Sequence, residues 1–152
     1  MKSFSNKVLL GIIVLLTAAL AITAAIKLSP LLNPPQKISL PLNTACDLHQ
    51  GPCAASLPGG GRVEFSLEPR PIPVLKPLKL QVRATGFKAG SVEVDFAGAD
   101  MKMAFNRPRL TSGKDGLYAG EATLPVCVRD QMAWRATVLV ESDGKRIAVP
   151  FR

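Results

Sequence analysis

Two of the three cysteines and the only histidine of this chain fall within one run of eight residues, Cys46-Asp-Leu-His-Gln-Gly-Pro-Cys53. Thiolate and imidazole groups are donors that suit Cu(I), and two thiols can instead oxidise to a disulfide. Cys46, His49 and Cys53 are therefore candidate copper ligands, and Cys46 with Cys53 is a candidate disulfide. The simpler alternative for His49 is a solvated loop residue, and its position between two cysteines is what singles it out.

A second group of soft donors is the pair Met101 and Met103. Residues two apart on a strand point to the same face of a sheet, so the two thioether sulfurs would converge on one ion. Thioethers do not form disulfides and stay available to Cu(I) in an oxidising compartment. Met132 and His49 could complete such a site. The alternative is that Met101 and Met103 are ordinary core residues, because methionine fills irregular gaps well.

The three cysteines of the chain permit one disulfide and leave one thiol over. Cys46 and Cys53 would close a short loop that contains a Gly-Pro turn signal. Cys127 would instead join the segment before the strands to the strand domain. The sequence favours neither pairing over the other, and a fully reduced metal site is the third alternative.

Arg107 and Arg109 flank a proline in the sequence Asn106-Arg-Pro-Arg109. They are candidates for a basic rim at which an acidic partner would dock. The simpler interpretation is a solvated sheet edge, where Pro108 discourages the addition of another strand.

The chain has few of the groups that enzymes or nucleic-acid-binding proteins need. His49 is the only imidazole, and no His-Glu-x-x-His, Gly-x-Ser-x-Gly, Walker or Gly-x-Gly-x-x-Gly motif is present. We therefore expect the protein not to be an enzyme. The formal net charge of +8 is scattered, and one Trp and one Tyr offer little stacking surface. This pattern argues against nucleic acid and favours an anionic membrane surface or an acidic partner.

The N-terminal residues predict a membrane anchor. Residues 1–7 carry two lysines and no acidic residue, and the nineteen residues from Val8 to Ile26 are uncharged. A helix of that length rises about 30 Å, which is the thickness of a bilayer core. The basic flank favours a cytoplasmic N-terminus, so the rest of the chain would lie outside the cytoplasm. The alternative is a cleaved signal peptide, since the small residues Ala19 and Ala21 suit a signal peptidase.

The rest of the chain divides into a spacer and a strand domain. Residues 27–61 are rich in proline and glycine, which predicts a semi-rigid linker, and they include the Cys/His loop. We expect one short edge strand in this linker, at residues 37–40. In residues 62–152, apolar and polar side chains alternate with a period of two between turn signals. The predicted inward-facing residues are Val63, Phe65, Leu67, Leu78, Leu80, Val82, Ala84, Val92, Val94, Phe96, Trp134, Ala136, Val138, Val140, Ile147, Val149 and Phe151. We therefore predict an all-β, immunoglobulin-like antiparallel β-sandwich preceded by one transmembrane helix.

One N-terminal helix, a Pro-rich spacer and a small sandwich resemble the FixH/YtkA-like group of bacterial exported domains. The resemblance is carried by residues 8–26, the strand at residues 77–86 and the run Gly98-Ala-Asp-Met-Lys-Met-Ala-Phe-Asn-Arg107. Members of that group are associated with copper handling and with cytochrome oxidase assembly in the cell envelope. The resemblance implies that Met101 and Met103 are copper ligands. The chain departs from the group in having no His-rich tail and no His-x-Met pair.

Together these features predict a single-pass protein of the bacterial inner membrane with its C-terminal domain in the periplasm. Its leading predicted function is copper delivery or cytochrome oxidase assembly. Met101, Met103, His49 and one or more cysteines would hold Cu(I) and pass it to a partner by ligand exchange. The alternative is a non-metal accessory or interaction subunit of a respiratory or other membrane complex, with a disulfide bracing the Cys/His loop.

Overall fold

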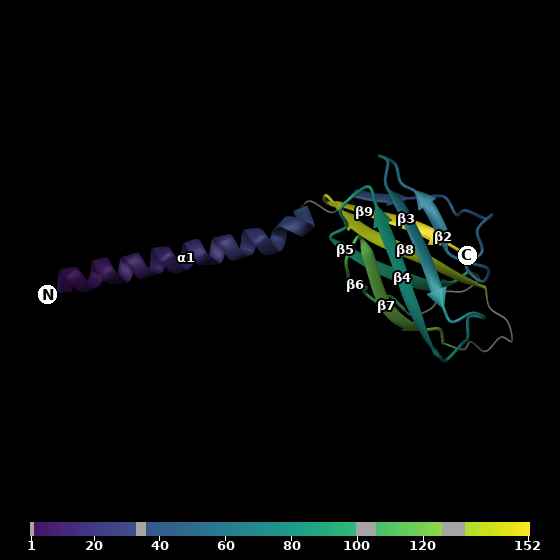
Figure 1. Ribbon diagram of the computed structural model, residues 1–152. Coiled ribbons are helices and arrows are strands. Elements are labelled where there is room, and N and C mark those ends of the chain that lie inside the picture. Colours follow the sequence, from purple (N-terminus) through teal and green to yellow (C-terminus); the bar gives the residue numbers. More distant parts are fainter. Residues whose placement is uncertain (1, 33–35, 100–105, 126–132) are drawn as a thin grey trace. The chain divides into compact units, whose positions relative to one another are not determined.

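The computed structural model describes residues 2–32, 36–99, 106–125 and 133–152 (Figure 1). The chain divides into two compact units, Met1–Pro35 and Gln36–Arg152. The first unit contains one helix, and all strands of the described residues belong to the second. The predicted donors Met101, Met103 and Met132 and the disulfide candidate Cys127 lie outside the described residues.

Helix α1 (Lys2–Leu32) forms the first unit. Its segment Asn6–Leu28 has a mean hydropathy of 2.7, and in the described ranges α1 is the one helix long and apolar enough to cross a membrane. A signal sequence near an N-terminus has the same length and composition. The predicted apolar helix is confirmed, and it extends beyond the predicted end at Ile26 to Leu32, with Pro30 inside it.

The second unit consists of two β-sheets that form a sandwich-like arrangement (Figure 1). The strands are β1 (Gln36–Ser39), β2 (Cys53–Ser56), β3 (Arg62–Glu68), β4 (Pro77–Thr85), β5 (Ser91–Gly98), β6 (Thr111–Ser112), β7 (Leu117–Thr123), β8 (Trp134–Ser142) and β9 (Lys145–Phe151). One sheet has the order β1-β9-β8-β5, and the other has the order β2-β3-β4-β7-β6. Neighbouring strands are antiparallel except β1 and β9, which are parallel.

The core lies between the two sheets and follows the predicted alternation. In β4, every second residue is buried, beginning with Leu78, while the residues between them are exposed. β3, β5, β8 and β9 bury the apolar positions that the sequence predicts, with Trp134 only partly buried. Phe65 of β3 and Phe151 of β9 come from different sheets, and their ring centroids are 5.8 Å apart. Burial of one face per strand therefore drives the packing of the two sheets.

Tight turns match the predicted turn signals. β8 and β9 are joined through Asp143 and Gly144, which have φ angles of 48° and 70°. Two consecutive positive φ angles are the geometry of the hairpin turn that matches strand twist, and Asp-Gly is a favoured sequence for it. Gly116, before β7, has a φ of 70°, and a Cβ there would collide with the carbonyl oxygen of Ala84.

The strand unit begins before the predicted boundary at residue 62. β1 is the predicted short edge strand, one residue earlier than expected, and its Ile38 pairs with Ile147 of β9. β2 carries Cys53, which pairs with Phe65 of β3. The Cys/His loop therefore connects two strands of the sandwich instead of lying in a separate spacer.

Three strands, β2, β6 and β7, were not predicted from the sequence. β7 buries only Tyr118 and Ala122, and small residues occupy most of its other positions. A Cβ at Gly120 would collide with the side chain of Leu110, which packs over this strand. Small residues in β7 make room for Leu110, so the period-two signal is weak there.

Candidate functional site

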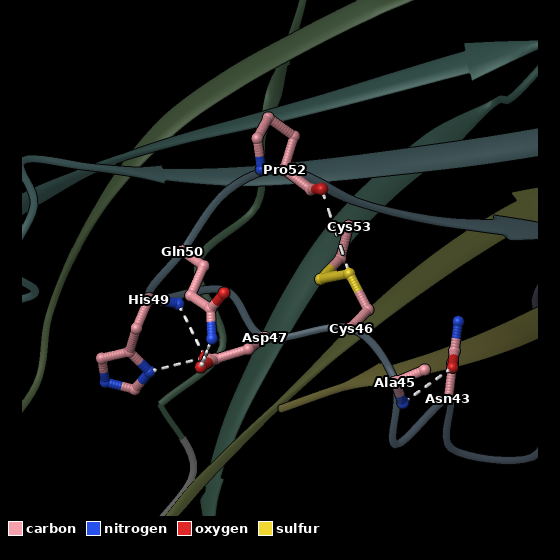
Figure 2. Close-up of a disulfide and its surroundings, with 8 residues drawn as sticks. All are labelled: Asn43, Ala45, Cys46, Asp47, His49, Gln50, Pro52 and Cys53. Carbon is pink, nitrogen blue, oxygen red and sulfur yellow. Dashed lines mark hydrogen bonds and ion pairs between the residues drawn. A yellow bond between two sulfur atoms is a disulfide. The ribbon is translucent and has the colours of Figure 1, made fainter.

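Cys46 and Cys53 form a disulfide, with their Cα atoms 5.7 Å apart (Figure 2). Cys53 is fully buried at the start of β2, and Cys46 is partly buried against the core. Of the two predicted pairings, the local one is therefore present, and it uses both loop cysteines. While the disulfide is closed, neither sulfur is a thiolate, so Cys46 and Cys53 could bind Cu(I) only in the reduced protein.

The carboxylate of Asp47 organises the loop between the two cysteines. It accepts hydrogen bonds from the backbone N–H of His49 at 2.9 Å and from the Gln50 side chain at 3.2 Å, and it lies 3.0 Å from Nδ1 of His49. Figure 2 shows the His49 ring and the Gln50 amide both turned toward this carboxylate. The hydrogen bond from the backbone of His49, followed by that from its side chain, lowers the pKa of Asp47 below its ordinary value. Asp47 is therefore ionised at neutral pH.

The hydrogen bond with Asp47 determines which nitrogen of His49 can bind a ligand. An ionised carboxylate can only accept, so Nδ1 of His49 carries the proton that it donates to Asp47. In the neutral ring, Nε2 then keeps its lone pair. The His49 side chain is 69% exposed, so that lone pair is accessible. A histidine that donates one ring N–H to a carboxylate is the usual arrangement of a metal-bound imidazole.

Leu48 fixes this loop to the sandwich. Its side chain is buried in the core, and its backbone N–H donates to the carbonyl oxygen of Arg152 at 2.9 Å. The side chains on either side of it, Asp47 and His49, are exposed. The disulfide and Leu48 together hold the two polar residues at the surface in one conformation.

The loop borders a cavity of about 710 Å³ at one end of the sandwich. The loop contributes mainly polar groups, and the strands and the other loops contribute mainly apolar ones. The lining residues are Thr44, Ala45, Cys46, Asp47, Leu48, His49, Gln50, Leu67, Ile72, Val74, Phe96, Leu124, Pro125, Ala133, Trp134, Ala136 and Arg152. This volume is in the range of small-molecule sites. No sequence motif predicts the cavity, since its walls come from seven separate stretches of the chain.

Described residues that flank the predicted methionines lie around this cavity. Pro125 and Ala133, on either side of residues 126–132, both line it. Ala99, before residues 100–105, donates its N–H to the carbonyl oxygen of Ala133 at 2.8 Å. Asn106, after those residues, pairs with Phe96, which also lines the cavity. The described residues that flank these two ranges therefore line the cavity or contact residues that line it.

Among the described residues, no group of three or more His, Cys, Asp or Glu side chains could hold a metal ion. Asp47 and His49 are two such residues, and the remaining predicted donors are methionines or disulfide sulfurs. The described residues thus supply one imidazole with an oriented lone pair, which fits one position of a Cu(I) site.

Arg107, a predicted docking residue, forms a two-point ion pair with Asp95 of β5. Its Nε and Nη2 atoms lie 3.2 Å from the two carboxylate oxygens, and the hydrogen bonds to Asp95 raise the pKa of the guanidinium. Arg109 is exposed and pairs through its backbone with Glu93 of β5. The two arginines lie beside the edge strand β5, and the ion pair of Arg107 helps to attach the segment 106–110 to that strand.

Comparison with protein-family models, with curated proteins and with solved structures found no match to this chain.

Proposed function

We propose that this protein is a single-pass membrane protein of the bacterial cell envelope with an immunoglobulin-like domain in the periplasm. The strand order supports the immunoglobulin-like assignment. β3, β4, β7 and β6 follow the order A-B-E-D, and β9, β8 and β5 follow G-F-C. The additional strand β1 extends the second sheet beside β9.

Two observations support the orientation. The N-terminus of α1 carries Lys2 and Lys7, and basic residues favour the cytoplasmic side of a membrane helix. The disulfide between Cys46 and Cys53 is stable in an oxidising compartment, and the periplasm is one. Together they favour a domain outside the cytoplasm.

For its activity we propose copper handling, either copper delivery or assistance in assembling a cytochrome oxidase. The observation that carries this proposal is the pair of Asp47 and His49, in which Nδ1 lies 3.0 Å from the carboxylate and Nε2 is left as the donor atom. Met101 and Met103 would supply thioethers, since residues flanking their segment lie by the cavity that His49 lines. With the disulfide closed, these three residues form the proposed ligand set.

The proposed mechanism is ligand exchange. Asp47 orients the imidazole by accepting a hydrogen bond from Nδ1–H of His49. Thioethers and a neutral imidazole bind Cu(I) and, unlike thiols, cannot be lost to disulfide formation. A partner that offers more soft donors then takes the Cu(I) ion. The proposed recipient is a respiratory oxidase in the same membrane.

Cu(I) titration of the full chain in detergent tests this proposal. Ascorbate keeps copper reduced, and non-reducing mass spectrometry verifies that the disulfide stays closed. We expect one Cu(I) per chain, with affinity at least tenfold lower in His49→Ala and in the double variant Met101→Leu/Met103→Leu. Gln50→Ala is the matched control, because Gln50 contacts Asp47 without being a ligand, and its affinity should equal that of the wild type. Absence of binding, or equal affinity in all variants, would refute the proposal.

The second candidate is a non-metal accessory subunit of a membrane complex. It is favoured by the cavity of about 710 Å³, whose apolar walls include Ile72, Leu124 and Trp134. In this case the chain would co-migrate with a respiratory or other membrane complex in native gels, with or without copper. The double methionine variant would leave that co-migration unchanged.

A further inference from the structure

Two apolar side chains stand exposed at one end of the sandwich. Val74 is 51% exposed and Leu75 is 66% exposed. In the part of the chain whose burial is described, they are the only large apolar side chains with such exposure outside α1. They are adjacent in the segment between β3 and β4, so they form a single apolar tip.

The backbone holds this tip in an unfavourable conformation. Leu75 has a φ of 57°, a region in which its Cβ crowds the following carbonyl oxygen and which bulky residues rarely occupy. Its N–H donates to the carbonyl oxygen of Leu124 at 2.9 Å, which helps to keep the conformation. Strained residues of this kind concentrate at functional surfaces, because the surrounding structure must compensate their cost.

The segment is also stiff and basic. Residues 69–77 contain four prolines, which fix φ and reduce the conformational entropy that docking would remove. Arg70 and Lys76 flank the apolar tip and are both exposed. No acidic residue lies between Pro69 and Pro77. The tip therefore combines exposed apolar groups with a positive rim.

We propose that Val74 and Leu75 insert into the interfacial region of an anionic phospholipid bilayer, with Arg70 and Lys76 contacting lipid phosphates. Apolar side chains beside basic residues are the combination that binds such surfaces. Two side chains are few for a stable protein–protein interface, which buries on the order of 800 Å² per partner. They are enough for a tethered domain, because an anchor in the same chain raises its effective concentration at the bilayer.

This inference rests on the proposed anchoring by α1 but not on copper binding, and it would place the tip at the lipid surface. The test uses the full chain, with Trp134→Phe to remove the only tryptophan, reconstituted into vesicles containing brominated phosphatidylglycerol. A new tryptophan is introduced by Leu75→Trp. The matched control is Ser112→Trp in β6, where Ser112 pairs with Tyr118 at the end of β7 away from the tip.

We expect brominated lipid to quench the tryptophan at position 75 by at least twofold and the one at position 112 by little. Adding Arg70→Ser and Lys76→Ser should reduce the quenching at position 75, as should replacing the brominated anionic lipid by equally brominated phosphatidylcholine. Equal quenching at the two positions would overturn the proposal, and so would quenching that does not depend on lipid charge. Either result would leave a protein partner as the occupant of this surface. Alkaline carbonate extraction of the same vesicles tests the anchoring separately.

Discussion

The hydroxyl of Tyr118 donates a hydrogen bond of 2.8 Å to the carbonyl oxygen of Ala89. Tyr118 belongs to β7 of one sheet, and Ala89 lies in the connection from β4 to β5 of the other. Both residues are buried, so this bond satisfies two polar atoms that water cannot reach. The bond also attaches the β4–β5 connection, which passes from one sheet to the other, to the core.

Removing this hydroxyl should destabilise the domain. In Tyr118→Phe the ring remains, but the carbonyl oxygen of Ala89 loses its partner, which costs about 1–3 kcal/mol. The measurement is urea unfolding of the detergent-solubilised chain, followed through the single tryptophan, Trp134. A midpoint equal to that of the wild type would mean that water replaces the hydroxyl.

Opening the disulfide should also lower stability. It closes a loop with a sequence separation of 7, for which loop-closure entropy gives about 2 kcal/mol. Reduction of the wild type is the cleanest comparison, because it leaves both side chains in the core. We expect the reduced protein and the double variant Cys46→Ser/Cys53→Ser to unfold at lower urea concentration, while the double variant itself no longer responds to reductant. A response that persists in the double variant would place the effect elsewhere.

Glu141 should make the stability depend on acid pH. The Ser91 hydroxyl donates to its carboxylate at 2.8 Å, and Arg146 lies 2.9 Å away. The Ser91 hydrogen bond, with the charge of Arg146, lowers the pKa of Glu141 below its ordinary value of 4.5. Because the folded pKa is the lower one, this stabilisation is fully present above about pH 4.5 and is lost as the pH falls through the folded pKa.

The variant Glu141→Gln measures this effect. The wild type should be more stable than the variant at pH 7, and the difference should shrink toward pH 3. Since the Glu141 side chain is 44% exposed, we expect a difference below about 1 kcal/mol at pH 7. If the difference in stability stayed constant from pH 7 to pH 3, it would come from side-chain packing and not from the charge of Glu141.

Three glycines should respond differently to substitution by alanine. At Gly116 the φ of 70° is combined with a Cβ position that overlaps the carbonyl oxygen of Ala84, so we expect a loss above about 2 kcal/mol. Gly144 has the same φ but open space, which predicts about 1–2 kcal/mol from backbone strain alone. Gly51 has neither feature and serves as the control. Urea unfolding of the three variants should give this order.

The sequence alone was enough to predict the elements whose signal is local. An uncharged run long enough for a membrane predicts α1, and alternation with a period of two predicts β3, β4, β5, β8 and β9. Their inward-facing side chains could be named in advance because successive residues of a strand point to opposite faces. β7 was not predicted because its residues are small where Leu110 packs against it, so its sequence lacks an alternation of large apolar side chains.

Tertiary structure decided which distant groups meet. Three cysteines allow several pairings, and the folded loop brings the Cα atoms of Cys46 and Cys53 to 5.7 Å from each other. The ion pair of Arg107 with Asp95 and the cavity beside His49 likewise depend on how strands separated in sequence lie together. The sequence could place His49 between two cysteines, but the orientation of its ring by Asp47 required the folded loop. The physical reason is that side-chain periodicity is a property of each segment, whereas pairing depends on register and on packing between sheets.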